Sequence, residues 1–313
     1  MIEVRNLTKR FGATVALDDV TFDVPAGEVL GFLGPNGAGK TTAMRIITCY
    51  ISQDGGSVRV DGLDTSNQSV EVRRRIGYLP ESAPLYLDMG VLEYLAFIGR
   101  IRGLEASRLK PRIDEMVTVC GLGRMAHRTI GTLSKGFRQR VGLAQTLIHD
   151  PEVLLLDEPT TGLDPNQIVE IRDLIRRIGE RKTIVLSTHI LPEVEATCSR
   201  VLIINEGRLV ASGTPHELAT QSQRDTRIFL TVNARPEAVE PTLRQSGIVS
   251  DLRLVSTAEG KVRYEIGSPV EEPEAQLFQL AVQHQWVLTE LRRESMSLEQ
   301  VFTRLTTKEA IDR

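Results

Sequence analysis

The sequence has few cysteines, and their spacing matches neither a disulfide framework nor a metal site. Its three cysteines, Cys49, Cys120 and Cys198, are odd in number, far apart, and placed in apolar helical patterns without metal-ligand spacing. This excludes a disulfide framework and a cysteine-based metal site. We expect reduced, buried thiols.

Long apolar runs and net charge are also lacking. No apolar run approaches the ~18 to 20 residues needed to cross a bilayer, and the N-terminus "MIEVRNLTKRFG" lacks a signal peptide's apolar core. We therefore expect a cytoplasmic chain. The formal net charge is only −3, so no global field favours nucleic acid or an anionic membrane, and no nucleic-acid partner is expected.

The chain of 313 residues is long enough for about two domains. Residues 1–221 alternate short β-rich runs with longer helical patterns, which predicts an α/β domain on a mainly parallel sheet. Three runs, "EVLGFLG" (28–34), "EVLLLD" (152–157) and "TIVLST" (183–188), are almost continuously apolar, as in strands buried on both faces. Ligands in such sheets gather at the carboxyl ends of the strands.

Two further regions are distinct. Residues from about 82 to 150 carry helical patterns only, which indicates a helical insertion. After a polar boundary at "SQRDT" (222–226), residues 222–313 have the order β-α-β-β-α-β, a ferredoxin-like pattern, and then a helix with Ser297 and Gln300 as a capping box. This α+β domain has no catalytic constellation, so regulation and dimerisation are equally open for it.

The segment "GPNGAGKTT" (34–42) has the spacing of a phosphate-binding loop and stands between a predicted strand and a predicted helix. Glycines let consecutive N–H groups wrap around phosphates, Lys40 reaches the β- and γ-phosphates, and Thr41 places its hydroxyl on Mg²⁺. The predicted nucleotide-binding residues of this loop are Gly34, Pro35, Asn36, Gly37, Ala38, Gly39, Lys40, Thr41 and Thr42.

Polar residues follow the other two buried strands. In "VLLLDEP", Asp157 fits a metal ligand and Glu158 a general base that polarises the attacking water. The alternative is a pair of carboxylates at the N-terminus of a following helix. His189 follows "TIVLST" and should emerge beside Lys40 and Asp157, where it would contact the γ-phosphate or position the water.

A second phosphate-facing helix start lies almost a hundred residues after the loop. In "TLSKGFRQR" (132–140), Ser134, Lys135 and Gly136 open a predicted helix whose N–H groups attract anions. A single nucleotide already has its phosphates enclosed by residues 34–42. We therefore predict a head-to-tail dimer in which each copy caps the ATP held by the other.

The order of the phosphate loop, "LSKGFRQR", "LLLDEP", "TGLDP" and "STH" over residues 1–221 resembles the ATP-binding subunits of ABC transporters. The resemblance implies that Phe11 in "KRFG" stacks on adenine, although a core position was the alternative, and that Asp164 passes signals across the dimer. It also implies that the "YLPE" segment, and more broadly residues 76–102, contacts a membrane permease on the cytoplasmic face of the membrane.

The whole chain looks like the ATPases of exporters whose permease is a separate polypeptide, and segments 78–89 and 133–167 look most like the gliding-motility-associated subgroup. It departs from the usual LSGGQ signature at Lys135 and Phe137. Glu81 stands where a glutamine is usual, so it would bind Mg²⁺ directly or, if protonated, mimic the amide.

The activity implied is Mg²⁺-dependent hydrolysis of ATP that drives a conformational change in the permease. One alternative is an ABC-type ATPase acting on ribosomes or DNA, but the chain has neither a second ATPase unit nor a long coiled coil. A small-molecule kinase with the same phosphate loop is another, although it would have no use for residues 132–140.

Overall fold

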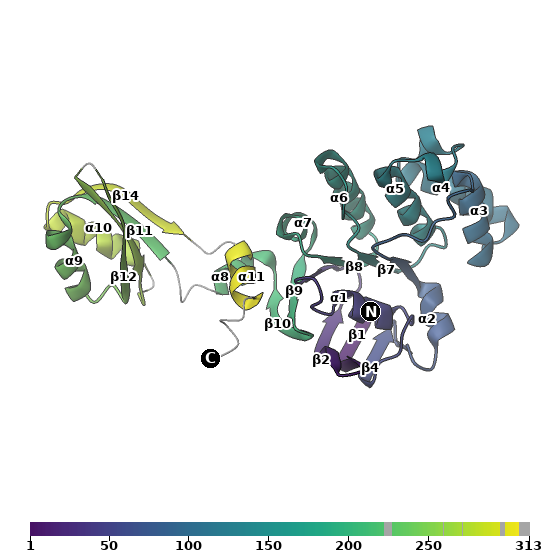
Figure 1. Ribbon diagram of the computed structural model, residues 1–313, viewed down its shortest axis with the longest axis horizontal. Helices are drawn as coiled ribbons and strands as arrows, with labels where there is room; N and C mark the ends of the chain where they lie inside the picture. The colour runs from purple at the N-terminus through teal and green to yellow at the C-terminus, as the bar shows by residue number, and fades with distance from the viewer. Residues whose placement is uncertain (222–226, 259, 271, 295–297, 307–313) are drawn as a thin grey trace. The chain divides into compact units, whose positions relative to one another are not determined.

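In the computed structural model, which describes residues 1–221, 227–258, 260–270, 272–294 and 298–306, the chain divides into two compact units, Met1–Pro215 and His216–Arg313. Figure 1 shows both units, each of which combines helices with β-sheet. No helix of the described residues is both long enough and apolar enough to span a membrane. The predicted boundary at 222–226 and the predicted cap at Ser297 lie outside the described residues.

The main sheet of the first unit has six strands in the order β10-β9-β3-β8-β7-β6. Its strands are β3 (Val29–Leu33), β6 (Ile76–Leu79), β7 (Val153–Asp157), β8 (Thr183–Thr188), β9 (Arg200–Asn205) and β10 (Arg208–Gly213). All neighbouring pairs are parallel except β9 with β10. The three apolar runs of the sequence form β3, β8 and β7 side by side, so their carboxyl ends open on one edge.

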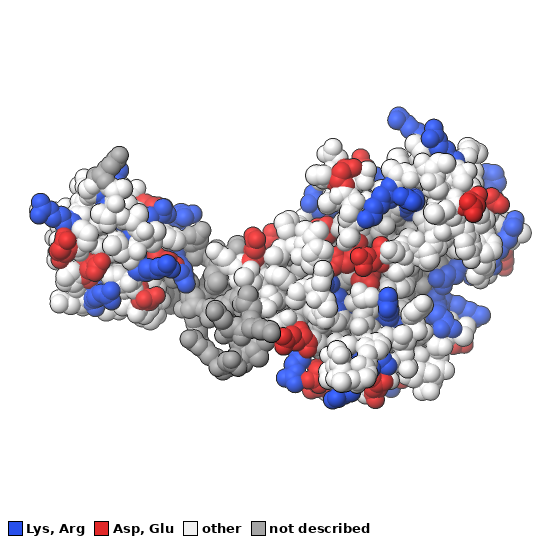
Figure 2. Space-filling view, in the orientation of Figure 1, with Lys and Arg blue, Asp and Glu red and all other residues white. Residues whose placement is uncertain are grey.

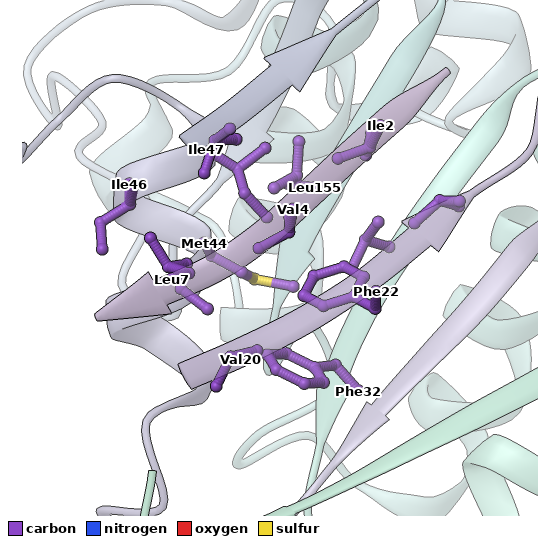
Figure 3. Packing of buried hydrophobic residues seen from close by; sticks show 14 of the residues in the cluster. Ile2, Val4, Leu7, Val20, Phe22, Phe32, Met44, Ile46, Ile47 and Leu155 are labelled. Carbon is purple, nitrogen blue, oxygen red and sulfur yellow. The ribbon is translucent and has the colours of Figure 1, made fainter. Parts of the chain in front are cut away.

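A second sheet of this unit is antiparallel, with the order β2-β1-β4-β5, and the sequence patterns did not predict it. It is formed by β1 (Ile2–Phe11), β2 (Thr14–Val24), β4 (Gly55–Val60) and β5 (Leu63–Asp64). Figure 3 shows the core in which side chains of this sheet, such as Val4, meet Leu155 and Phe32 of the main sheet and Met44 of α1. The core therefore fixes α1, and with it the loop before it, between two sheets.

Helices of the first unit connect and cover these strands. They are α1 (Lys40–Ile47), α2 (Ser69–Arg75), α3 (Val91–Ile101), α4 (Ala106–Val119), α5 (Lys135–Leu147), α6 (Pro165–Gly179) and α7 (Leu191–Thr197), with 3-10 turns η1 (Gly123–Met125) and η2 (Ile130–Thr132). Helix α6 shows why the sequence folds so: Asp164 caps it, Pro165 opens it, and its apolar residues recur at Ile171, Leu174 and Ile178 on one buried face.

The second unit has a four-stranded antiparallel sheet in the order β12-β13-β11-β14. Its elements are α8 (Pro215–Gln221, which starts at the last residue of the first unit), β11 (Arg227–Asn233), α9 (Pro236–Gln245), β12 (Asp251–Ala258), β13 (Lys261–Gly267), α10 (Pro273–Gln283), β14 (Val287–Glu294) and α11 (Leu298–Thr306). Alternating residues of β11 and β13, such as Leu230 and Tyr264, pack with Leu243 and Leu277 of the helices in a separate core.

The cysteines and the surface charges agree with the composition. All three cysteines are free; Cys120 and Cys198 are buried as expected, but Cys49 is only half-buried. On the face drawn in Figure 2, basic and acidic side chains are interspersed in each unit.

Candidate active site

The loop between β3 and α1 is shaped by glycines that no other residue could replace without movement. A Cβ at Gly34 would lie 2.4 Å from the Ile204 carbonyl oxygen, and one at Gly39 would lie 2.6 Å from that of Ala16. Gly39 also has a φ of +109°, in the region that favours glycine. The backbone of the loop therefore packs closely between β9 and β2 and continues into the N-terminus of α1. Backbone N–H groups in such a loop and at a helix N-terminus can bind phosphate.

Lys40 is the first residue of α1 and is 6% exposed. Its Nζ donates hydrogen bonds to the carbonyl oxygens of Gly34 (2.7 Å) and Pro35 (3.2 Å) and lies 3.5 Å from Glu158 Oε1. A buried ammonium is stable only with such partners. They hold its charge directly over the glycine-rich loop.

Asp157 is the last residue of β7 and is almost fully buried. Its Oδ1 accepts hydrogen bonds from the hydroxyls of Thr41 (3.2 Å) and Ser187, and its Oδ2 accepts one from Tyr78 (3.5 Å). Burial, followed by the negative charge of Asp157, raises the pKa of Tyr78 to about 12, so the phenol remains a donor at neutral pH.

These oxygens fit Mg²⁺. The Thr41 hydroxyl and the Asp157 carboxylate are hard donors already adjacent at the end of the loop. Among the described residues, no group of three or more His, Cys, Asp or Glu is placed to hold a metal ion. Mg²⁺ takes one or two protein ligands and fills the other positions with water and phosphate oxygens.

Glu158 has a positive φ of 49°, uncommon for a residue with a side chain. Its N–H donates to the Ser187 carbonyl oxygen (3.1 Å), and its Oε2 accepts from the Thr161 hydroxyl (3.2 Å) and lies 2.8 Å from His189 Nδ1. The alternative in which this carboxylate caps the next helix is wrong. Helix α6 begins only at Pro165 and is capped by Asp164.

The predicted residues converge on one cavity of about 360 Å³ at the carboxyl ends of β3, β7 and β8. It is lined by Ala16, Asn36, Gly37, Gly39, Lys40, Thr41, Thr42, Glu81, Glu158, Thr161 and His189. Asp157, Gly34, Pro35 and Ala38 belong to the same loop or to the end of the strand but do not line the cavity.

Phe11 is not among the residues that line the cavity. It is 52% exposed, and Lys9 Nζ lies 5.5 Å from the centroid of its ring. The alternative that Phe11 is a core residue is therefore wrong.

The second helix start does not line this cavity. Ser134 caps α5 by accepting a hydrogen bond from the N–H of Phe137 (3.4 Å). A Cβ at Gly136 would lie 2.4 Å from Gln167 Oε1, so the start of α5 packs closely on the start of α6. Lys135 and Asp164 also stand outside the cavity lining. Residues 134–136 and Asp164 therefore form a separate surface of the unit.

Comparison with known proteins decides the family. Residues 17–161 match the sequence model described as "ABC transporter". The linearmycin resistance ATP-binding protein LnrL of Bacillus subtilis (strain 168) is 32% identical over 308 residues, covering 98% of each chain. This chain belongs to the ABC transporter ATP-binding proteins.

Further relatives agree with this assignment. Nod factor export ATP-binding protein I of Burkholderia lata is 38% identical, covering 69% of this chain and 72% of that protein. Among solved structures, the dimeric post-hydrolysis state of the ATP-binding cassette MJ0796 bound to ADP and Pi superimposes with a TM-score of 0.63 at 26% identity, covering 68% of this chain and 98% of that one. The ABC ATPase therefore has the α/β P-loop fold of this family, hydrolyses ATP, and uses Mg²⁺ with it.

The sequence patterns missed several residues of the ABC ATPase site. Thr161 and Ala16 line the cavity, and Tyr78 and Ser187 hold the Asp157 carboxylate. Thr161 stands in "DEPTTGLDP", three residues after Glu158, and that spacing could have identified it. Tyr78 lies on β6 and Ala16 on β2, and both strands are distant in sequence from the residues they meet in the site. Nothing in the local sequence indicates their role.

Proposed function

We propose that this ABC ATPase is the ATP-hydrolysing subunit of an exporter whose permease is a separate polypeptide, and that it works at the cytoplasmic face of the membrane. The observation that carries the proposal is the convergence of Lys40, Asp157, Glu158 and His189 on one cavity while the start of α5 stays outside it. Export is supported by the names of the relatives, one a resistance protein and one a Nod factor export protein. We propose further that it belongs to the gliding-motility-associated subgroup of such exporters, a proposal that the likeness of segments 78–89 and 133–167 supports.

In the proposed mechanism the N–H groups of residues 34–42 bind the phosphates, and Lys40 binds the β- and γ-phosphates. Thr41, Asp157 and Glu81 would hold Mg²⁺, which would neutralise the negative charge that develops on the phosphate oxygens. The carboxylate of Glu158 accepts the proton of the attacking water. His189 and Thr161 orient this carboxylate through their contacts with Oε2. His189 contacts the γ-phosphate through Nε2, because Nδ1 faces Glu158.

The site is completed by a second copy of the chain. Ser134, Lys135 and Gly136 of one copy cap the ATP of the other, Phe11 stacks on adenine, and Asp164 relays the state of one site to the other. The dimeric structure of a relative supports this arrangement. Such an isologous dimer closes on ATP and opens after hydrolysis, because the γ-phosphate is the shared contact.

We assign the permease contact to a groove of about 680 Å³ beside the nucleotide cavity. Its lining combines Tyr78, Pro80, Ser82 and Pro84 of the "YLPE" region with Ile98, Ile101 and Arg102 of α3, and with Arg45, Thr48, Tyr50, Arg73, Ile76, Gln145 and Thr146. The apolar side chains of Tyr50 and Ile101 are 74% and 64% exposed. Exposed apolar surface of this kind suits a partner that covers it. Because Tyr78 also bonds Asp157, the groove shares a residue with the site.

We assign residues 1–221 to the ATPase domain, with residues 82–150 as its helical subdomain, and residues 222–313 to a ferredoxin-like domain. The strand order β12-β13-β11-β14 and the element order β11-α9-β12-β13-α10-β14 support the ferredoxin-like assignment. We assign this domain to regulation or dimerisation, since its described residues show no catalytic cluster.

The test is affinity purification of the tagged chain from detergent-solubilised native membranes, followed by mass spectrometry. We expect one polytopic membrane protein in near-equal amount. Ile101→Glu should lose that protein and keep ATP hydrolysis, whereas Val169→Glu, a matched change at an exposed valine of α6, should keep both. Recovery with ribosomal or DNA-associated proteins instead would contradict the transporter assignment and leave the ATPase chemistry intact.

A further inference from the structure

A buried carboxylate that the mechanism does not use lies one turn after the candidate catalytic histidine. Glu193 is in the first turn of α7, is 4% exposed, and makes its only described side-chain hydrogen bond with Oε2, which accepts from the Thr188 hydroxyl at 2.9 Å. Its Oε1 is buried and has no hydrogen-bond partner among the described residues. A carboxylate left half-satisfied in this way costs stability, so its presence calls for another reason.

The hydrogen bonds of Glu193 enclose the segment that carries His189. Thr188 Oγ1, which donates to Glu193, also accepts a hydrogen bond from the N–H of Ile190 at 3.0 Å. The N–H of Glu193 in turn donates to the Ile190 carbonyl oxygen at 3.2 Å. Thr188 and Ile190 are the two neighbours of His189 in the chain, so this ring of bonds fixes the backbone on both sides of the imidazole.

Glu193 is itself anchored to the main sheet. Helix α7 packs against β3 and β8, and a Cβ at Gly31 of β3 would lie 3.0 Å from both Val194 Cγ1 and Cys198 Sγ. The glycine lets α7 approach β3 closely. Strand β3 also leads into the phosphate loop, so the helix that carries Glu193 packs against the strand that precedes the loop and Lys40.

The imidazole needs such support because little else holds it. The His189 side chain is 43% exposed, and its described contact is the one from Nδ1 to Glu158 Oε2 at 2.8 Å. A change of backbone angle at Thr188 or Ile190 would swing the ring away from Glu158.

We propose that Glu193 is a positioning residue for His189: through the Thr188 hydroxyl it holds residues 188–190 in the conformation that presents the imidazole to Glu158 and to the γ-phosphate. The inference rests on the role proposed above for His189 in hydrolysis. Glu193 does not contact the nucleotide cavity, so it should affect the rate of the chemical step and leave ATP binding unchanged.

The test compares Glu193→Ala with Glu193→Gln, which keeps an oxygen acceptor for Thr188, and with Glu195→Ala, a matched change at an exposed glutamate of the same helix. Single-turnover hydrolysis of γ-labelled ATP, with the chain in excess, resolves slow rates. We expect Glu193→Ala to lower the rate constant at least about tenfold, and both other variants to stay near the parental rate. The KM for ATP, measured separately under steady-state conditions, should stay within about twofold of the parental value. A parental rate in Glu193→Ala, or failure of Glu193→Gln to restore it while thermal unfolding is unchanged, would overturn the proposal.

A double-mutant cycle separates positioning from general structural support. In the His189→Ala background, Glu193→Ala should cause no further loss of rate, because the histidine it positions is gone. A further loss there would show that Glu193 does not act through His189. If His189→Ala alone left the rate unchanged, the proposed role of His189 would fail, whereas normal loss in His189→Ala with none in Glu193→Ala would remove only the present inference.

Discussion

At the scale of single residues, the site depends on a carboxylate held by groups from three segments. Glu158 is bound by Thr161 from its own turn, by His189 after β8, and by the ammonium of Lys40 from α1. Its positive φ directs the side chain away from the course of β7 and into the cavity. Backbone strain of this kind, about 1–3 kcal/mol, persists where the surroundings impose it, and it is common at active sites.

The role of Glu158 as base predicts the behaviour of its amide variant. Glu158→Gln keeps the shape and the hydrogen bonds but cannot accept a proton, so we expect kcat to fall by about 10²-fold or more. ATP should still close the dimer, and size-exclusion chromatography with ATP and Mg²⁺ should show a stable dimer that the parental protein does not accumulate. Hydrolysis at the parental rate would show that another group is the base.

The chemistry-bearing residues could be predicted because each stands next to a local signal. Asp157 and His189 directly follow apolar runs, and parallel strands bring their carboxyl ends to one edge. Glu193 could not be predicted, since a glutamate after a proline at a helix start is normally a solvent-exposed partner of the helix dipole. Its burial follows from the close approach of α7 to β3 at Gly31, a contact between distant parts of the chain.

At the scale of elements, the junction between α5 and β6 contains a half-buried histidine. His149 Nε2 lies 3.1 Å from the Ile76 carbonyl oxygen, and Nδ1 is buried with no hydrogen-bond partner among the described residues. Burial, followed by the positive charge of Arg102, lowers the pKa of His149 to about 4; Arg112 and Lys182 add smaller effects of the same sign. The helix is thus packed on the sheet with a neutral imidazole.

This junction predicts a pH dependence of stability. Between pH 4 and about 6.5 the unfolded chain binds a proton at this histidine and the folded chain does not. The free energy of unfolding should therefore decrease as pH falls through that window, by about 1.4 kcal/mol per pH unit at most, and the penalty should be absent above it. Urea unfolding at pH 5 and pH 7 should show a smaller difference for His149→Gln than for the parental chain.

An exposed histidine provides the control for this prediction. His127→Gln should keep the parental difference between pH 5 and pH 7, because the group is solvent-exposed in the folded chain. Equal differences in the parental chain and in His149→Gln would mean that the junction does not exclude the proton.

Strands β3, β7 and β8 of the main sheet were predictable, and the pairing of strands that forms the antiparallel sheet was not. Strands β3, β7 and β8 can be recognised from their continuous apolar runs, because both their faces are buried. In β1, by contrast, the buried Ile2, Val4 and Leu7 break the strict alternation, and the pairing of β1 with β2 has register shifts between Val4 and Lys9. Such shifts interrupt the alternation of buried and exposed side chains from which a half-buried strand and its register are recognised in a sequence.

At the scale of the whole molecule, each unit has its own core, but neither contains a complete catalytic site by the mechanism proposed. The loop of residues 34–42 and the start of α5 belong to the same unit and yet line different surfaces. Two copies related by a twofold axis would bring each surface of one against the other surface of its partner.

Complementation between two inactive variants tests this arrangement. Lys40→Ala removes the phosphate contact of a chain's own nucleotide, and Ser134→Ala removes the cap on its partner's. Each variant alone should be inactive, but in an equal mixture half of the dimers are mixed and each has one intact site. We expect ATP hydrolysis to recover to about a quarter of the parental rate. A mixture as inactive as its components would mean that both residues serve the same nucleotide.

The packing of the phosphate loop also determines when during its synthesis the protein becomes competent to bind ATP. The loop packs between Ala16 on one side and Ile204 on the other. Ala16 is synthesised before the loop, and Ile204 is synthesised only near the end of the first unit. At ~5–20 residues per second, Ile204 leaves the ribosome's catalytic centre about 10 to 30 s after the loop does. We therefore expect the phosphate loop to reach its final conformation only when the first unit is nearly complete.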